Sequence, residues 1–129
     1  MPKHKLFYHF IWSTKHRRPL LDPETKNIVK KAIIAKAIDL RSIVLAIDGS
    51  EDHMHLLVSA PPAIAPSVLI GQVKGVSSHL VRHLGRKDFS WQREYGVKTV
   101  SEHDVPKVMQ YIQSQEKHHT HSCVHQRPP

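Results

Sequence analysis

The sequence predicts an α+β sandwich, on the evidence of three features of the 129-residue chain. Segments typical of strand and of helix follow one another in the order strand, helix, strand, strand, helix, strand, helix. A short turn alone separates the two middle strands, which indicates a β-hairpin. The length fits one domain, and a hydrophobic content of 40% is enough for an ordinary core. We therefore expect a ferredoxin-like arrangement, a four-stranded antiparallel sheet with helices on one face, plus an extra C-terminal helix.

The first half of the chain predicts a strand, a basic loop and a helix. Residues 5–12 are rich in aromatic side chains, as strands are, and residues 13–19 form a basic segment closed by a proline. Asp22 can cap a helix and Pro23 suits its first position, so a helix should run to about Leu40. Its expected inward face is Ile28, Val29, Ala32, Ile33, Ala35 and Ala37, with Lys26, Lys30 and Lys31 outside it.

The second half predicts the hairpin, two further helices and a last strand. Its expected elements are a buried strand over 42–48, a turn over 49–52, a strand over 53–59, a helix over 67–84, a short strand within 91–100 and a helix from 101 to about 118. The helix over 67–84 should face inward with Val68, Leu69, Val73, Val76, Leu80 and Leu84. We expect residues 1–118 to form one domain and 119–129 to be a flexible, histidine-rich tail.

The charge of the chain indicates a polyanionic partner. Nineteen Lys and Arg residues against eleven Asp and Glu residues give a net charge of +8, before any of the twelve histidines is protonated. No apolar run approaches the length of a membrane span, and the basic start is not followed by the apolar stretch of a signal peptide. The single cysteine, Cys123, cannot form an internal disulfide. We therefore expect a cytoplasmic protein without a membrane partner.

Two histidines at alternate positions of one predicted strand are the first candidate for chemistry. His53 and His55 should point to the same side of the sheet, with Met54 in the core behind them. Two adjacent neutral imidazoles offer two positions of a metal coordination sphere. In a chain with twelve histidines, such spacing also arises by chance on a polar sheet face. Asp52 is close enough in sequence to orient one of the two rings.

A second candidate pair lies on the last predicted helix. Tyr111 and Gln115 are four residues apart and so share a face of that helix. A tyrosine hydroxyl can act as a nucleophile, and an amide oxygen can bind a hard cation such as Mg²⁺. Taken alone, the spacing also fits a packing tyrosine beside a surface glutamine.

Basic residues form two further clusters that suit phosphate contacts. The predicted loop carries Lys15, Arg17 and Arg18, with Lys3 and Lys5 nearby in sequence, and the second predicted helix carries Lys74 and Arg82. We expect these residues to contact nucleic acid, although a solvated surface loop has a similar composition. The end of the chain carries four of the histidines, His118 and, in the tail, His119, His121 and His125, and could bind a transition metal adventitiously.

Together these segments resemble the single-tyrosine HUH transposases of small bacterial insertion sequences and their relatives associated with repetitive extragenic palindromes. The HUH motif, two histidines around a hydrophobic residue, is here His53-Met54-His55. Residues 8–19 are similar to the family's opening strand and basic loop, and Tyr111 to Gln115 to its nucleophile helix. The resemblance covers about residues 5–119. The motifs are specific in combination, whereas a lone HUH is a weak signal.

The resemblance implies a DNA transposase that cleaves and rejoins single-stranded DNA beside a hairpin. It implies His53, His55 and Gln115 as ligands of Mg²⁺ or Mn²⁺, and Tyr111 as the nucleophile that forms a 5′-phosphotyrosine intermediate. It also implies a homodimer with shared active sites, in which the tyrosine of one subunit completes the histidine pair of the other.

Three other classes fit part of the sequence. A non-catalytic module could bind single strands by stacking bases on the aromatic residues of the first strand, Phe7, Tyr8, Phe10 and Trp12. A relaxase or replication initiator also uses histidine pairs and tyrosine, but the small size and the tyrosine on a late helix argue against it. A metal-storage protein would use the histidines and ignore DNA.

Overall fold

A computed structural model describes residues 6–115 and confirms the expected order of strands and helices. The elements are β1 (Leu6–Ser13), α1 (Pro23–Asp39), β2 (Ile43–Gly49), β3 (His53–Ala60), α2 (Pro66–His83), β4 (Gly96–Val100) and α3 (Val105–Gln113), with 3₁₀ turns η1 (Lys15–Arg17) and η2 (Glu102–Asp104). The strands form one sheet in the order β2-β3-β1-β4, and each neighbouring pair is antiparallel. The predicted ferredoxin-like sheet is therefore confirmed.

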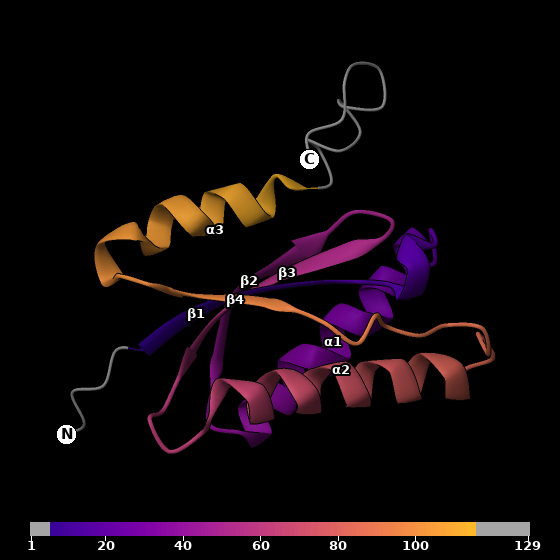
Figure 1. The fold of residues 1–129 in the computed structure, drawn as a ribbon, viewed down its shortest axis with the longest axis horizontal. Helices are drawn as coiled ribbons and strands as arrows, with labels where there is room; N and C mark the ends of the chain where they lie inside the picture. The colour runs from indigo at the N-terminus through magenta and orange to yellow at the C-terminus, as the bar shows by residue number, and fades with distance from the viewer. Residues whose placement is uncertain (1–5, 116–129) are drawn as a thin grey trace.

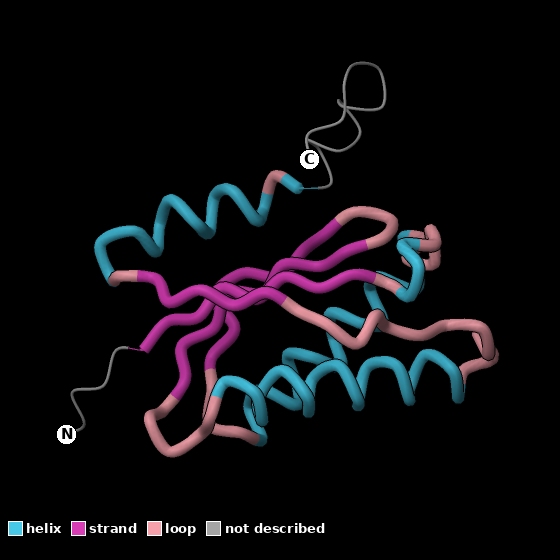
Figure 2. Tube along the Cα trace, in the orientation of Figure 1, coloured by secondary structure: helices cyan, strands magenta, loops and turns pink. Residues whose placement is uncertain are grey.

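The sheet lies between two helical layers (Figures 1 and 2). α1 and α2 pack together on one face, whereas α3 crosses the opposite face, which we call the open face. The extra C-terminal helix is thus separated from the other two by the whole sheet. Because α3 covers only part of the open face, polar side chains of the sheet remain accessible beside it.

The alternation of side chains along the central strands produces two cores. On β1 and β3, Phe10, Met54 and Leu56 are fully buried under α1 and α2. The residues that alternate with them along the strands face α3. On that side Leu57 packs with Ile112 of α3 in a smaller core. The predicted burial of Met54 is confirmed. Since neighbouring residues of a strand point to opposite faces, a buried Met54 directs both flanking histidines to the open face.

α1 begins as the sequence predicts, but two of its residues differ from the expectation in burial. The Asp22 side chain accepts a hydrogen bond from Thr25 N (2.7 Å), and Pro23 is the first helical residue. Ala35, expected to face inward, is exposed. Lys26, expected outside, is buried, with Nζ donating to Gly49 O (3.0 Å) and lying 3.3 Å from Asp48 Oδ1. The ion pair and hydrogen bond compensate the burial of its charge.

Several other expectations differ from the structure in their boundaries or burial. The strand expected over 42–48 is β2, a partly exposed edge strand, because only β3 pairs with it. Val68 and Leu84, expected to face inward, are exposed near the two ends of α2. The short strand expected within 91–100 is confirmed as β4, but the last helix begins at Val105 and not at 101, after a 3₁₀ turn. Its expected end near residue 118 lies outside the described residues.

Within residues 6–115, no helix combines the length and the apolar character that a membrane span requires.

Candidate active site

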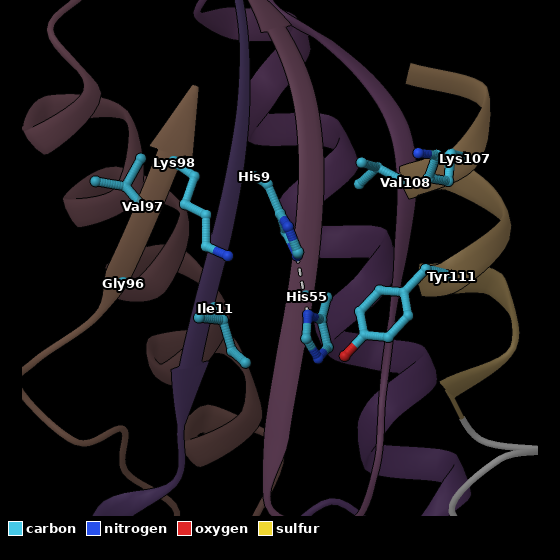
Figure 3. Close-up of a pocket in the computed structure, with 9 residues that line it drawn as sticks. All are labelled: His9, Ile11, His55, Gly96, Val97, Lys98, Lys107, Val108 and Tyr111. Atoms are coloured by element: carbon cyan, nitrogen blue, oxygen red, sulfur yellow. Dashed lines mark hydrogen bonds between the residues drawn. The ribbon is translucent and has the colours of Figure 1, made fainter. Parts of the chain in front are cut away.

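Four side chains from three separate elements converge on the open face beside α3, and Figure 3 shows three of them, His9, His55 and Tyr111. His53 and His55 stand side by side on β3, with ring centroids 5.2 Å apart. The ring of Tyr111, on α3, meets the ring of His55 edge-on at 5.4 Å. His9, on β1, lies 5.2 Å from His55 between the same centroids. The predicted common orientation of His53 and His55 is confirmed, and Tyr111, distant in sequence, is brought to the pair.

His53 is positioned by two residues of the turn between β2 and β3. Its Nδ1 atom lies 2.9 Å from the Asp52 carboxylate and 2.8 Å from Ser50 Oγ. Arg17, from the basic loop, lies 3.6 Å from the same carboxylate. Burial acts to raise the pKa of Asp52, but the hydrogen bond from His53 and the charge of Arg17 outweigh it and lower that pKa. An ionised Asp52 accepts from Nδ1–H, so His53 Nε2 carries the free lone pair.

His55 is almost completely enclosed, with 3% of its surface exposed. Its Nδ1 atom shares a hydrogen bond of 2.9 Å with Nε2 of His9. Burial, reinforced by the positive charges that His53 and His9 can carry, lowers the pKa of His55 to about 3, while a hydrogen bond with the Gln115 side chain acts in the opposite sense. At neutral pH His55 is therefore a neutral imidazole, which is the form that binds metals.

Tyr111 and Gln115 are placed by the packing of α3 on the sheet. Ile112, between them in sequence, is fully buried against Ala46 and Leu57 and anchors the helix. Tyr111 is 51% exposed and therefore accessible to a substrate, whereas Gln115 is only 7% exposed. Gln115 Nε2 donates to the carbonyl oxygen of Tyr111 (3.4 Å), so its Oε1 atom is the end left to accept or to coordinate. The predicted shared helix face thus brings both residues to His55.

The predicted DNA-contacting residues fall into two groups. Lys15, Arg17 and Arg18 follow β1 in an exposed turn, near the end of the strand pair that carries His53. Lys74 and Arg82 belong to α2, in the layer across the sheet from α3 (Figure 1). The structure does not bring this second group to the histidine pair. Residues 3 and 5 and the histidines of the tail lie outside the described residues.

Lys74 and Arg18 already have protein partners. The Lys74 ammonium group donates to the carbonyl oxygens of Gln92 (2.8 Å) and Arg93 (3.0 Å), in the segment that leads into β4. Burial lowers the pKa of Lys74, and the charge of Glu94 opposes that shift. Arg18 pairs with Asp88 at 3.2 Å.

The stacking platform that a non-catalytic module would need is largely absent from the described residues. Phe10 and Trp12 are buried in the core under α1 and α2, and Tyr8 packs against that core. These three side chains therefore stabilise the fold, and Phe7, the fourth aromatic residue of the strand, is partly buried.

Sequence reasoning missed His9, which contacts both His55 and Tyr111. Burial, together with the charge of Lys98, lowers its pKa. A signal was present, since His9 lies between Tyr8 and Phe10, and its neighbour Phe10 belongs to the core. Alternation then places His9 on the same face as His55. Only the pairing of Ile11 with His55 shows that the two histidines are diagonal neighbours.

Comparison with known proteins places these residues in a family. A family model described as "Transposase IS200 like" matches residues 2–115. The ISDra2 transposase TnpA of Deinococcus radiodurans is 30% identical over an alignment of 119 residues that covers 87% of this chain and 85% of that protein. The transposase of insertion element IS200 of Salmonella typhimurium is 30% identical over 116 residues, covering 84% of this chain and 75% of the relative.

Solved structures of transposases share the fold. The crystal structure of a putative transposase from Deinococcus radiodurans superimposes with a TM-score of 0.69 at 30% identity, covering 89% of this chain and 94% of that one. A REP-associated tyrosine transposase bound to a REP hairpin gives a TM-score of 0.67, covering 88% and 70%. At 19% identity the second likeness shows the fold alone. The family match over nearly the whole described chain confirms the resemblance seen in the sequence: the chain belongs to the IS200-like transposases and is a transposase.

Proposed function

We propose that this transposase cleaves and rejoins single-stranded DNA by transesterification, with Tyr111 as the nucleophile. The observation that carries the proposal is the convergence of Tyr111 with the histidine pair, its ring 5.4 Å from that of His55. Tyr111 is exposed on the open face, whereas His55 beside it is buried and neutral. A nucleophile accessible to a strand of DNA thus lies next to side chains that can position a phosphate.

The proposed step exchanges one phosphodiester for another. The Tyr111 hydroxyl oxygen attacks the phosphorus of the scissile phosphate, and the bond from phosphorus to the 3′ oxygen breaks. The phenol loses its proton, and the departing 3′ oxygen gains one, so the products are a 5′-phosphotyrosine and a free 3′-OH. A 3′-OH of the same or another strand can reverse the step, so rejoining needs no external energy source.

The residues present fit the expected Mg²⁺ or Mn²⁺. The Nδ1 atoms of His53 and His55 are both engaged in hydrogen bonds, so each ring would present its Nε2 atom to a metal on the open face. Within residues 6–115, no three His, Cys, Asp or Glu side chains are grouped as a metal site. A metal on the histidine pair would therefore take the amide oxygen of Gln115 as its third protein ligand. When bound, it would stabilise negative charge on the phosphate.

We further propose that two copies of the chain form a homodimer with shared active sites. α3 is joined to β4 by the short segment 101–104 and contacts the sheet mainly through β2 and β3. Exchange of α3 between two copies would preserve these contacts while pairing each Tyr111 with the partner's histidine pair. The substrate would be single-stranded DNA at hairpin-bearing ends, and the cytoplasmic location remains a prediction.

A covalent-adduct assay tests the proposal. Labelled single-stranded oligonucleotides from the flanks of the protein's own gene are incubated with the protein and Mg²⁺ or EDTA, then run on a denaturing gel. We expect a protein-linked band that is lost in EDTA and in Tyr111→Phe. Tyr95→Phe, at another exposed tyrosine, is the matched control and should keep the band. An adduct that persists in Tyr111→Phe contradicts the proposal.

A further inference from the structure

A cavity of about 590 Å³ opens on the open face between β4 and α3. Nine residues from β1, β3, β4 and α3 line it (Figure 3). Gly96 shapes its floor, because a Cβ atom there would lie 3.0 Å from Ile11 Cγ2. We call it the α3–β4 pocket. Its volume is within the range of pockets that hold small organic ligands.

The α3–β4 pocket combines an apolar centre with a cationic rim. Its centre is formed by Ile11, Val97 and Val108, and two lysines, Lys98 and Lys107, are exposed around it. None of the described residues that line it is acidic. Apolar surface suits the flat face of a nucleobase, and ammonium groups suit the phosphates on either side of its sugar. A cationic ligand would be repelled by the two lysines, and a purely apolar ligand would make no use of their charge.

The position of the pocket relates it to the reaction. Tyr111 and His55 form part of its wall, so a phosphate at the Tyr111 hydroxyl has its neighbouring nucleotide beside the pocket. We propose that the α3–β4 pocket receives one nucleobase of the single-stranded DNA, that of a nucleotide next to the phosphate attacked by Tyr111. Lys98 and Lys107 would contact the adjacent backbone. The inference rests on the proposed function and adds to it a base-binding subsite.

The first test removes the base and the pocket in turn. Oligonucleotides with a single abasic position on either side of the scissile phosphate are compared with the intact strand in the adduct assay. Loss of the base at one of these two positions should slow adduct formation about tenfold in the unmodified protein, the size of a typical base contact. Ile11→Trp, which fills the pocket, should slow the intact strand similarly and make the abasic substitution ineffective. Ile34→Trp on α1 is the matched control, since both isoleucines are 39% exposed.

Independent effects of Ile11→Trp and of the abasic position would overturn the inference. If Ile11→Trp and the abasic position each slow the reaction by the same factor whether or not the other is present, the base does not occupy the pocket. If neither abasic substitution changes the rate of adduct formation, no base next to the scissile phosphate occupies the pocket. If no oligonucleotide forms an adduct with the unmodified protein, the proposed function itself fails, which distinguishes the two failures.

A second measurement avoids the catalytic step and any substitution in the pocket. The Tyr111→Phe protein is titrated into oligonucleotides that carry the fluorescent base 2-aminopurine at each position in turn. We expect a fluorescence change at one position beside the scissile phosphate that exceeds the change at distant positions. The free 2-aminopurine nucleotide should bind far more weakly, because the rest of the strand contributes phosphate contacts. Equal changes along the strand would contradict a dedicated base pocket.

Discussion

At the scale of single residues, the chemistry of His55 depends on the side chains behind it. Its Nδ1 atom is hydrogen-bonded to His9 Nε2 at 2.9 Å, so His9 holds the orientation of the ring. His53 has the corresponding support from Asp52. Each ring is thereby held through its Nδ1 atom, and the two supports come from different parts of the chain.

His9→Phe removes the partner of His55 while keeping an aromatic ring on β1. We expect Mn²⁺ affinity to fall about 10- to 100-fold, the usual effect of losing a hydrogen bond to a metal-binding histidine. Mn²⁺ binding is measured directly by electron paramagnetic resonance, without DNA. His9→Gln, which keeps a polar atom near the position of Nε2, should recover much of the affinity. His79→Phe, on the exposed side of α2, is the control. Unchanged affinity in His9→Phe would show that His9 does not position the site.

At the scale of elements, α3 places the nucleophile through few contacts. Ile112 is its one fully buried side chain among the described residues of the helix, and it packs on Ala46 and Leu57. The rest of the molecule has its main core on the other face of the sheet. Loosening α3 should therefore affect the site before it affects the global fold.

Ile112→Ala tests this separation. Truncating a fully buried isoleucine costs about 2–5 kcal/mol, and here the loss falls on the docking of α3. We expect faster hydrogen exchange in α3 and at least a tenfold loss of adduct formation, with little change in the exchange of β1 and β3. Gln113→Ala, exposed on the same helix, is the matched control. Uniformly faster exchange across the sheet would contradict an independently docked helix.

The N-cap of α1 gives a prediction with a defined pH dependence. The hydrogen bond from the Thr25 backbone lowers the pKa of Asp22 below its ordinary 3.8. The cap therefore stabilises the fold fully above that value and loses its effect as the pH falls through the lowered pKa. Asp22→Ala should cost about 1 kcal/mol in urea unfolding near neutral pH, and this cost should shrink in acid. Asp22→Asn, which caps without titrating, is the control. A cost independent of pH would refute the charged cap.

The sequence predicts the elements of this fold better than their faces. Strand alternation around Met54 and the cap at Asp22 are local signals, and both are confirmed. Which face of a helix is buried depends on what packs against it. The sequence pattern predicts an exposed Lys26, but in the structure its buried ammonium group pairs with Asp48 and donates a hydrogen bond to Gly49 O. The pairing of His9 with His55 depends on strand register, and no local pattern encodes it.

At the scale of the whole molecule, shared active sites make two inactive variants complementary. Tyr111→Phe keeps its histidines and His55→Ala keeps its tyrosine, so each alone should form no adduct. If α3 is exchanged between two copies, a mixture of the two variants should regain activity, because one site of the mixed dimer contains both groups. The matched control pairs Tyr111→Phe with the double variant that lacks both groups. A mixture as inactive as its components would contradict shared sites.

The net charge of +8 gives the molecule a long-range attraction for DNA. Binding of single strands should weaken as salt rises, and each lost phosphate contact should reduce the salt slope by about one. Arg18→Ala should therefore give a shallower slope than Lys31→Ala, on the exposed side of α1. Affinity is measured by fluorescence anisotropy over a series of salt concentrations. Equal slopes for the two variants would remove Arg18 from the DNA-contacting surface.

The most direct test of the account is to locate the covalent bond between protein and DNA. The chain has three tyrosines, Tyr8, Tyr95 and Tyr111, so the attachment site is decided by mass spectrometry of the digested adduct. The account predicts a nucleotide joined through its 5′ phosphate to Tyr111 alone, with a free 3′-OH on the released strand. A phosphate on another residue, or cleavage that leaves no covalent bond, would contradict it.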